Sequence, residues 1–263
     1  MTVGNTRDWK NTVAAYYDDD AGKWVKDTMV EPERYYFSPY FTRLSELRPQ
    51  GNRAIDIGCG GGVFTFELCR YPFSEVYALD ISEKMLAALE DEKKRRGIKK
   101  VKTVKSDVEK LPFDDNSVDF IVSVGVMECL KDQRKALAEM RRVLKPGGTL
   151  YIRWINRQGI WALFERVLKA LHIPSSPFSF PDYFTLEEAL AKQQAAGFTV
   201  TYTQGTVLFP LFMVPYPLSK LFKLALVDTG ITYALEGYKK TDTHAISQWY
   251  YAFTTEATKE KER

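Results

Sequence analysis

From about Asn52 onward, short apolar runs alternate with stretches of helical periodicity, and this alternation constrains the fold more than any other feature. The runs AIDIG, VYALDIS and VKTVKSD have the character of strands, and VFTFELCRY and EKMLAALEDEKKRRG that of the helices between them. The pattern continues with VDFIVSVG, a helix near residues 133–144, the turn KPGG and the strand TLYIRWI. Because strands joined through helices pair in parallel, we predict a doubly wound α/β sheet.

The later part of the chain predicts further core elements. Residues 185–196 have a helical pattern that Gly197 ends, and FTVTYTQ follows as a strand. The apolar run over residues 246–254 predicts the final strand. With 263 residues the chain suits one domain carrying insertions better than two independent domains.

Three stretches rich in aromatic residues fall outside the alternation: 1–45, 155–182 and 206–245. Insertions of this length in an open α/β fold are usually functional, so we expect them to form a largely helical cap over the ligand end of the sheet. The first is an N-terminal helical cap and the other two are cap insertions. The single domain, 1–263, then has a cofactor-binding core at 46–154 and the remainder of its core at 183–205 and 246–256.

Composition narrows the class of protein. A net charge of +3 and basic runs that follow an acidic stretch favour a solvated helix end over a nucleic-acid surface. Three cysteines without a CxxC pair, and only two histidines, support neither a metal site nor a disulfide framework. The first residues lack an apolar signal region, and no uncharged apolar run reaches about 18 residues. We expect a cytoplasmic protein without a transmembrane segment.

A glycine-rich loop between the first strand and its helix indicates a nucleotide-type ligand. Gly58, Gly60 and Gly62 let the chain turn tightly and let a ligand approach the backbone. Asp80 lies 20 residues after Gly60, at the end of the next strand, where a carboxylate binds a ribose diol. These features alone fit a nicotinamide dinucleotide and S-adenosylmethionine almost equally well.

Charge favours S-adenosylmethionine. Asp56 stands two residues before the first glycine, where it would lie unfavourably near a pyrophosphate. The ammonium and sulfonium of S-adenosylmethionine are cations, for which this carboxylate is a suitable neighbour. Val63 also replaces the last glycine of the dinucleotide pattern. A nicotinamide-dependent oxidoreductase and a non-catalytic adenosylmethionine-binding protein remain the alternatives.

The chain resembles the class I S-adenosylmethionine-dependent methyltransferases of Rossmann-like fold, in particular the branch that includes ubiquinone, sugar and natural-product methyltransferases. Five blocks carry the resemblance over about 150 residues in family order: AIDIGCGGG, YALDIS, SDVEKLPFDDNSVDFIVSVGVMECL, RVLKPGGTLYI and FTLEEALAKQQAAGF. The resemblance implies a seven-stranded sheet, mostly parallel with an antiparallel last strand. It also implies that the cofactor lies over the carboxyl ends of the first strands and leaves as S-adenosylhomocysteine.

The same resemblance implies a set of cofactor-binding residues. Asp56 with Gly58, Cys59 and Gly60 looks like the methionine-binding loop. Asp80 looks like the ribose ligand, and Ile81 packs on adenine. Further members of the set are Asp107 and Val108 at the adenine amino group, Val124 beside the transferring methyl, and Tyr16 or Tyr17 closing over the cofactor. Asp107 could instead cap a turn, and either tyrosine could be plain core.

The acceptor and its base are less constrained. Sulfonium methyl transfer is an in-line displacement in which the protein aligns the nucleophile and excludes water. If the acceptor is a hydroxyl, a base helps, and the candidates are His244, Glu128 and a cap tyrosine. Where many relatives carry a histidine after the fourth strand, this chain has Met127-Glu128-Cys129, so the glutamate is present without the histidine.

The apolar and aromatic character of the cap predicts a small hydrophobic or aromatic acceptor. O-methylation is favoured, with N- or C-methylation as alternatives. The run at 208–226 is too interrupted by prolines to span a membrane, but peripheral membrane contact stays open. The sequence shows no motif of base amino methyltransferases and no basic stripe, so we expect no nucleic-acid partner. It does not define an oligomeric state.

Overall fold

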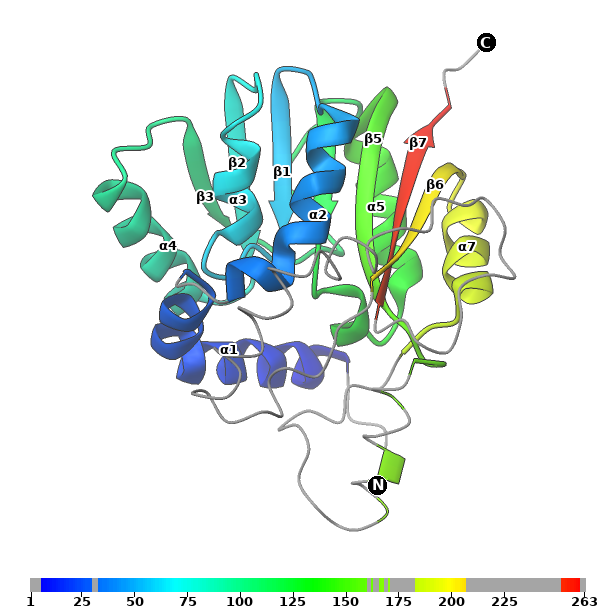
Figure 1. The fold of residues 1–263 in the computed structure, drawn as a ribbon, viewed down its shortest axis with the longest axis horizontal. Coiled ribbons are helices and arrows are strands. Elements are labelled where there is room, and N and C mark those ends of the chain that lie inside the picture. Colours follow the sequence, from blue (N-terminus) through cyan, green and yellow to red (C-terminus); the bar gives the residue numbers. More distant parts are fainter. Residues whose placement is uncertain are drawn as a thin grey trace, which may run out of the picture.

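The computed structural model describes residues 6–29, 33–159, 162, 166–167, 170, 183–206 and 252–260. A seven-stranded sheet in the order β3-β2-β1-β4-β5-β7-β6 forms its centre (Figure 1). The strands are β1 (Arg53–Ile57), β2 (Glu75–Asp80), β3 (Val101–Lys105), β4 (Val118–Ser123), β5 (Leu144–Ile155), β6 (Phe198–Thr206) and β7 (Ala252–Lys259). Strands β1 to β5 pair in parallel, and β7 runs antiparallel to β5 and β6. The predicted mostly parallel sheet with an antiparallel last strand is confirmed.

Helices cover both faces of this sheet. The helices with assigned bounds in the described part of the chain are α1 (Thr6–Met29), α2 (Glu33–Leu47), α3 (Val63–Leu68), α4 (Glu83–Arg95), the short 3₁₀ helix η1 (Met127–Cys129), α5 (Gln133–Val143) and α7 (Leu186–Ala195). Local sequence explains where several begin. Ser82 caps α4, Asp132 caps α5, and Thr185 with Glu188 forms a capping box at α7. None of the described helices is both long enough and apolar enough to cross a membrane.

The pleat of β1 separates two hydrophobic clusters. Ala54 belongs to the cluster that contains residues of α2, α3 and α4, whereas Ile55 and Ile57 belong to the cluster that contains residues of α5 and α7. Alternate side chains of a strand point to opposite faces, so Asp56 shares the face of Ala54. The largest side chains buried almost completely include Trp154 in the second cluster and Tyr40 of α2 in the first.

The final strand differs from its prediction. The predicted strand ends at residue 254, whereas β7 (Ala252–Lys259) continues to Lys259; residues 246–251 of the prediction lie outside the described residues. The polar sequence Thr-Thr-Glu-Ala-Thr-Lys conceals this strand, because Thr254, Thr255 and Glu256 are buried. Arg43 of α2 binds Glu256 through two hydrogen bonds, of 2.5 and 2.8 Å, and so satisfies the charge in the core.

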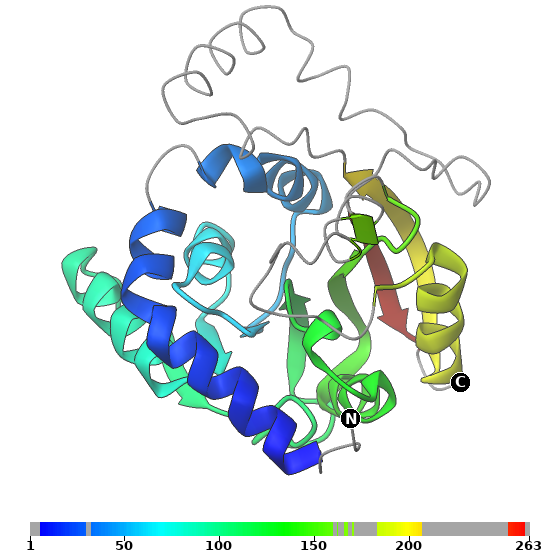
Figure 2. The same ribbon diagram turned by 90° about the horizontal axis from the view of Figure 1, so that it is seen from below.

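The predicted cap is described only in part. Helices α1 and α2 occupy the N-terminal stretch, and α2 packs Tyr40 and Leu44 against a face of the sheet. Helix α1 lies across the carboxyl ends of the parallel strands (Figures 1 and 2). The cap insertion at 206–245 lies almost entirely outside the described residues, as does much of 155–182. The proposed division into core and cap therefore stays a prediction.

Candidate active site

The glycine loop after β1 lies against the ends of two neighbouring strands. Gly58 and Gly60 have φ angles of 70° and 48°, in the left-handed region that favours glycine. The backbone N–H groups of Gly58 and Cys59 donate to the Leu79 carbonyl of β2, at 2.8 and 2.9 Å. A Cβ atom added to Gly58 would lie 2.2 Å from Cγ2 of Val126, beyond β4. The loop conformation therefore leaves no room for a side chain at Gly58.

Asp80, at the end of β2, is held by backbone donors from two directions. The N–H of Gly60 donates to its Oδ2 and the N–H of Ser82 to its Oδ1, both at 2.9 Å. Burial raises the pKa of Asp80, and its hydrogen bonds to backbone amides oppose that rise. A carboxylate oxygen accepts more than one hydrogen bond, so this group can still bind a pair of vicinal hydroxyls.

Asp56 faces helix α3. Its Oδ2 accepts a hydrogen bond of 2.6 Å from the Thr65 hydroxyl, and its side chain is 2% exposed. Burial, with a contribution from the charge of Asp80, raises the pKa of Asp56 to about 7 although Thr65 acts in the opposite direction. An approaching cation stabilises the ionised form of such a carboxyl group.

Asp107 follows β3 and is bound by a lysine from α1. Lys10 Nζ lies 2.5 Å from Oδ2 of Asp107 and 2.7 Å from Oε2 of Glu109. The N–H of Glu109 donates to Oδ1 of Asp107 at 3.0 Å, so the aspartate also caps a turn. Burial acts to lower the pKa of Lys10, but the bonds to the two carboxylates outweigh it and raise that pKa.

Two further side chains of α1, Asp18 and Trp9, bind segments at this end of the sheet, across which α1 lies in Figure 2. Asp18 accepts a hydrogen bond of 2.5 Å from the Ser82 hydroxyl and one of 3.2 Å from the Lys84 N–H. Trp9 Nε1 donates to the Cys129 carbonyl at 2.8 Å. Helix α1 is thus bound to the segments that follow β2, β3 and β4.

The two tyrosines of α1 have different surroundings. Their rings meet edge to face with centroids 5.3 Å apart. The Tyr17 hydroxyl lies 4.0 Å from Cys129 Sγ, and burial, with Cys129 and Glu128 nearby, raises its pKa well above its usual value. Tyr16 is half-buried. Tyr17 is therefore the neutral phenol that the structure brings to the segment after β4.

Glu128, in η1 after β4, forms a buried ion pair. Its Oε1 accepts a hydrogen bond of 2.9 Å from Nη2 of Arg153, on β5, and the side chains are 3% and 8% exposed. Oε2 of Glu128 is buried too and accepts no hydrogen bond from the residues that the structure describes. Gly125 lies beside the pair, since a Cβ added there would be 3.7 Å from Nη2 of Arg153.

The apolar candidates line the same strand ends. Ile81 follows β2 and is half-buried, and Val124 follows β4 and packs against the cluster of α2, α3 and α4. Val108 is buried in the opposite cluster. Cys59 is buried, and burial together with the charges of Asp80 and Asp56 raises the pKa of its thiol well above the usual value. The thiol is therefore protonated at neutral pH.

Comparison with known proteins agrees with this geometry. A family profile described as "Methyltransferase domain" matches residues 55–152. The demethylmenaquinone methyltransferase of Bacillus cytotoxicus is 28% identical over 195 residues, which cover 71% of this chain and 76% of that protein. The enzyme of the same name from Geobacillus kaustophilus is 40% identical over 101 residues, or 38% of this chain and 43% of that protein. The chain therefore spans less than half of the second relative.

The fold has solved counterparts. A SAM-dependent methyltransferase from Aquifex aeolicus superimposes with a TM-score of 0.58 at 21% identity, covering 90% of this chain and 97% of the other. The sheet order, the glycine loop and the family match lead to one conclusion. Residues 55–152 are a methyltransferase domain, within a fold like that of SAM-dependent methyltransferases. This match favours S-adenosylmethionine over a nicotinamide dinucleotide as the cofactor.

The residues of this methyltransferase fit that cofactor. Asp80 is oriented by backbone donors at the end of β2, where it would hold the ribose hydroxyls. Gly58 gives the backbone its close approach, and the charge of Asp56 suits a nearby ammonium. Asp107, after β3, remains a candidate ligand of the adenine amino group, although its carboxylate also binds Lys10.

The sequence pattern did not indicate two residues of the candidate site, Lys10 and Arg153. Lys10 gives no local signal, because its partners Asp107 and Glu109 come from a distant part of the chain. Arg153 could have been noticed as the one charged residue in TLYIRWI, which is otherwise an apolar strand. The candidate base His244 lies outside the described residues.

Proposed function

We propose that this methyltransferase transfers the methyl group of S-adenosylmethionine to a small hydrophobic or aromatic acceptor by in-line displacement. Its acceptor is a hydroxyl, so O-methylation is favoured over N- or C-methylation. The observation that carries the proposal is Oε2 of Glu128, a buried carboxylate oxygen in the segment after β4 that accepts no hydrogen bond from the described residues. The bound cofactor supplies an electrophilic methyl on a sulfonium, which needs no nucleophilic residue from the protein.

The named relatives support the acceptor class. Both are demethylmenaquinone methyltransferases, and that name denotes a quinone, whose reduced hydroquinone form is aromatic. A hydroquinone form carries hydroxyl groups that a carboxylate can deprotonate. His244 remains a second candidate for this role in our proposal.

Each described residue then has a defined task. Asp80 and Asp107 bind the nucleoside, and the glycine loop with Asp56 binds the amino acid portion. Ile81 and Val108 pack on the base, and Val124 lies beside the methyl group. Tyr17, more than Tyr16, closes the site from α1 and excludes water. These are the roles that we propose for the residues when the cofactor is bound.

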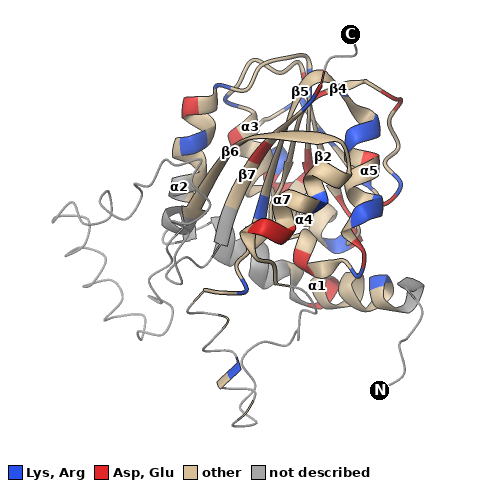
Figure 3. Ribbon diagram, turned by 90° about the vertical axis from the view of Figure 1, so that its right-hand side faces the viewer, with Lys and Arg blue, Asp and Glu red and all other residues tan. Residues whose placement is uncertain are grey.

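Proposed partners and location follow from chemistry. On the side of the molecule drawn in Figure 3, acidic and basic residues are interspersed rather than gathered into a basic stripe, which supports a small-molecule acceptor over a nucleic acid. Cys59, Cys69 and Cys129 are free thiols, which suits the reducing cytoplasm in which we place the protein.

The test is a labelled-methyl assay against host lysate separated into lipid extract, small polar metabolites and macromolecules. We expect labelled product in the lipid or small-molecule fraction. The Asp80→Ala variant is the control, because it removes the ribose ligand and must abolish both labelling and the binding of S-adenosylhomocysteine in calorimetry. Label confined to protein or RNA would refute the proposed acceptor class.

A further inference from the structure

The described part of the chain contains two Arg–Glu pairs in which the carboxylate is buried, Arg43–Glu256 and Arg153–Glu128, and they differ in one respect. In the pair of Arg43 and Glu256, the guanidinium binds both carboxylate oxygens, with Nε at 2.5 Å from Oε1 and Nη2 at 2.8 Å from Oε2. In the pair of Arg153 and Glu128, only Oε1 is bound, at 2.9 Å, and Oε2 accepts nothing from the described residues. We call the first pair saturated, because both carboxylate oxygens accept a hydrogen bond from its arginine; in the second pair only one oxygen does.

Stability does not account for an unsaturated buried pair. Removing two charges from water costs free energy that their attraction often fails to return, and apolar replacements are frequently neutral or better. An unsatisfied carboxylate oxygen adds to that cost. A ligand that binds this carboxylate oxygen would explain why the pair is present.

The position of the pair relates it to the reacting end of the cofactor site. Gly125 and Val126 lie between the pair and the glycine loop. A Cβ added to Gly125 would be 3.7 Å from Arg153, and a Cβ added to Gly58, in the loop, would be 2.2 Å from Val126. The charges of Glu128 and Asp80 both act on the Tyr17 hydroxyl, so one phenol is within electrostatic range of carboxylates from both regions.

Resting on the proposed function, we propose that Arg153 is a positioning residue that keeps Glu128 ionised, directs its Oε2 to an acceptor hydroxyl, and restricts the acceptor to phenols, enols and hydroquinones. The acceptor O–H bond breaks and its proton moves to Oε2. The acceptor then attacks the methyl carbon while the carbon–sulfur bond breaks, with its electron pair remaining on sulfur. Glu128 afterwards releases its proton to water.

Charge explains the selectivity. Before proton transfer, Glu128 and Arg153 neutralise each other; afterwards the carboxyl is neutral and the guanidinium faces the new oxyanion of the acceptor. The negative charge has moved from one oxygen to another beside the same cation. An amine acceptor gives no oxyanion and acquires positive charge as it reacts, which the buried guanidinium opposes.

A binding experiment tests this without turnover. The complex with S-adenosylhomocysteine is titrated with 4-nitrophenol, whose ionisation is followed by its visible absorption. We expect wild-type protein to lower the apparent pKa of the bound phenol by about one unit or more, and Arg153→Gln to abolish the shift. A wild-type complex that binds no nitrophenol, or leaves its pKa unchanged, overturns the inference.

Kinetics give the second readout, with anaerobic 1,4-dihydroxynaphthalene, 1-naphthol and 1-naphthylamine as acceptors. We expect transfer to the hydroxyl compounds only. Glu128→Gln lowers kcat by about 10²–10⁴-fold. Arg153→Gln moves the acid limb of kcat/KM to higher pH by about one unit, since a buried carboxyl without its counter-ion holds its proton more tightly, and Arg153→Lys restores part of this shift.

Arg43→Gln is the matched control. It breaks the saturated pair, and its pH profile of kcat/KM must be the same as that of wild type. An Arg153→Gln variant with the wild-type profile, or equal kcat/KM for the amine and the naphthol, overturns the inference. The proposed function fails separately, when wild-type protein shifts the nitrophenol pKa but methylates no acceptor in any lysate fraction.

Discussion

Gly58 of the glycine loop and Val126 beyond β4 meet so closely that a Cβ on Gly58 would be 2.2 Å from the Cγ2 of Val126. This contact joins the loop that we propose to bind the cofactor to the segment that carries Glu128. A collision at this point must displace one of the two segments. Changes at Gly58 are therefore expected to affect both cofactor binding and methyl transfer.

The first prediction concerns this contact. Gly58→Ala should weaken binding of S-adenosylhomocysteine by at least about tenfold in calorimetry, since an ordinary side chain there is both strained and overpacked. Gly97→Ala is the control: Gly97 also has a positive φ, 66°, but an added Cβ meets no atom within 4 Å. It should lose some stability and no affinity. Adding Val126→Ala to Gly58→Ala should recover part of the binding, and equal losses at Gly58 and Gly97 would contradict the role of the contact.

The second prediction uses the pKa of about 7 at Asp56. An unfolded aspartate has a pKa near 3.9, so the unfolded chain is ionised at pH 5 while folded Asp56 is mostly protonated. As pH rises through 7, the folded state loses stability relative to the unfolded state. Asp56→Asn removes this effect, and its free energy of unfolding relative to wild type should rise by on the order of 2 kcal/mol between pH 5 and 8.

Chemical denaturation of both proteins at several pH values measures that difference. Saturating S-adenosylhomocysteine should reduce its pH dependence, because an ammonium near Asp56 favours the ionised carboxylate. A difference that stays constant from pH 5 to 8 would show that Asp56 does not titrate in this range.

The third prediction addresses the attachment of α1. Lys10→Met removes the cation that Asp107 and Glu109 share, so α1 should hold less firmly to the segment after β3. We expect a rise of roughly 3–30-fold in the Kd for S-adenosylhomocysteine and faster amide exchange in α1. The wild-type affinity should also depend more strongly on salt than that of the variant.

Lys84→Met is the comparison for Lys10. The Lys84 side chain is 62% exposed and lies 3.9 Å from Asp19, so it forms only a surface pair. Its loss should leave affinity and exchange unchanged. If Lys84→Met weakens binding as much as Lys10→Met does, general charge rather than the attachment of α1 controls the affinity.

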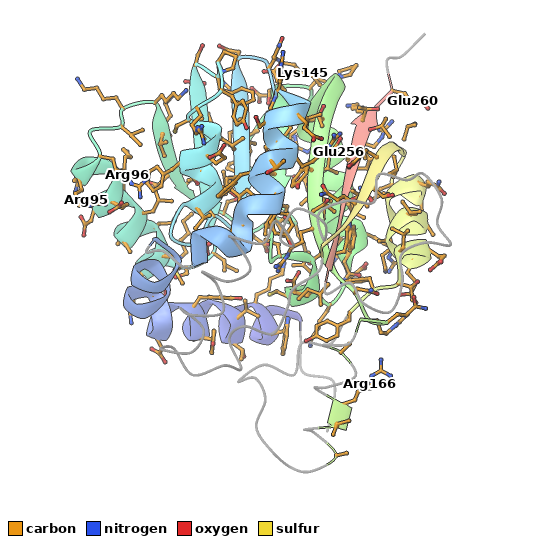
Figure 4. All side chains as sticks on the ribbon, viewed as in Figure 1. Arg95, Arg96, Lys145, Arg166, Glu256 and Glu260 are labelled. Carbon is orange, nitrogen blue, oxygen red and sulfur yellow. The ribbon has the colours of Figure 1, made fainter. Side chains whose placement is uncertain are left out.

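The fourth prediction concerns the saturated pair, whose Glu256 is labelled on β7 in Figure 4. Arg43→Met leaves Glu256 charged in the core and should cost about 2–4 kcal/mol of unfolding free energy. The double variant Arg43→Met with Glu256→Leu should be more stable than the single one, because no lone charge remains buried. Thermal and urea unfolding measure both, and a double variant less stable than the single variant would contradict this account.

The sequence predicted well what depends on local pattern. The glycine loop, the carboxylate at the end of β2 and the start of α7 at Thr185 each depend on neighbouring residues, and the structure has them where the pattern placed them. The position of Asp107 after β3 followed in the same way.

What the sequence could not predict depends on contacts between distant segments. Lys10 meets Asp107 across 97 positions, and no periodicity reports such a pairing. The end of β7 was placed too early because Glu256 looks like a surface residue until Arg43 of α2 is seen to neutralise it. Asp56 faces Thr65 because of the pleat of β1. The sequence does not show which helix covers which face of the sheet, so it could not predict this contact.

The place of β7 between β5 and β6 has a consequence for biosynthesis. A ribosome delivers β6 before β7, yet β6 pairs with no strand except β7 in the described sheet. The strands from β1 to β5 can associate on the nascent chain, while β6 has no partner among the other described strands until β7 has been synthesised. Insertion of β7 then completes two ladders in one event. The most vulnerable moment of this protein is therefore the interval between translation of β6 and release of β7.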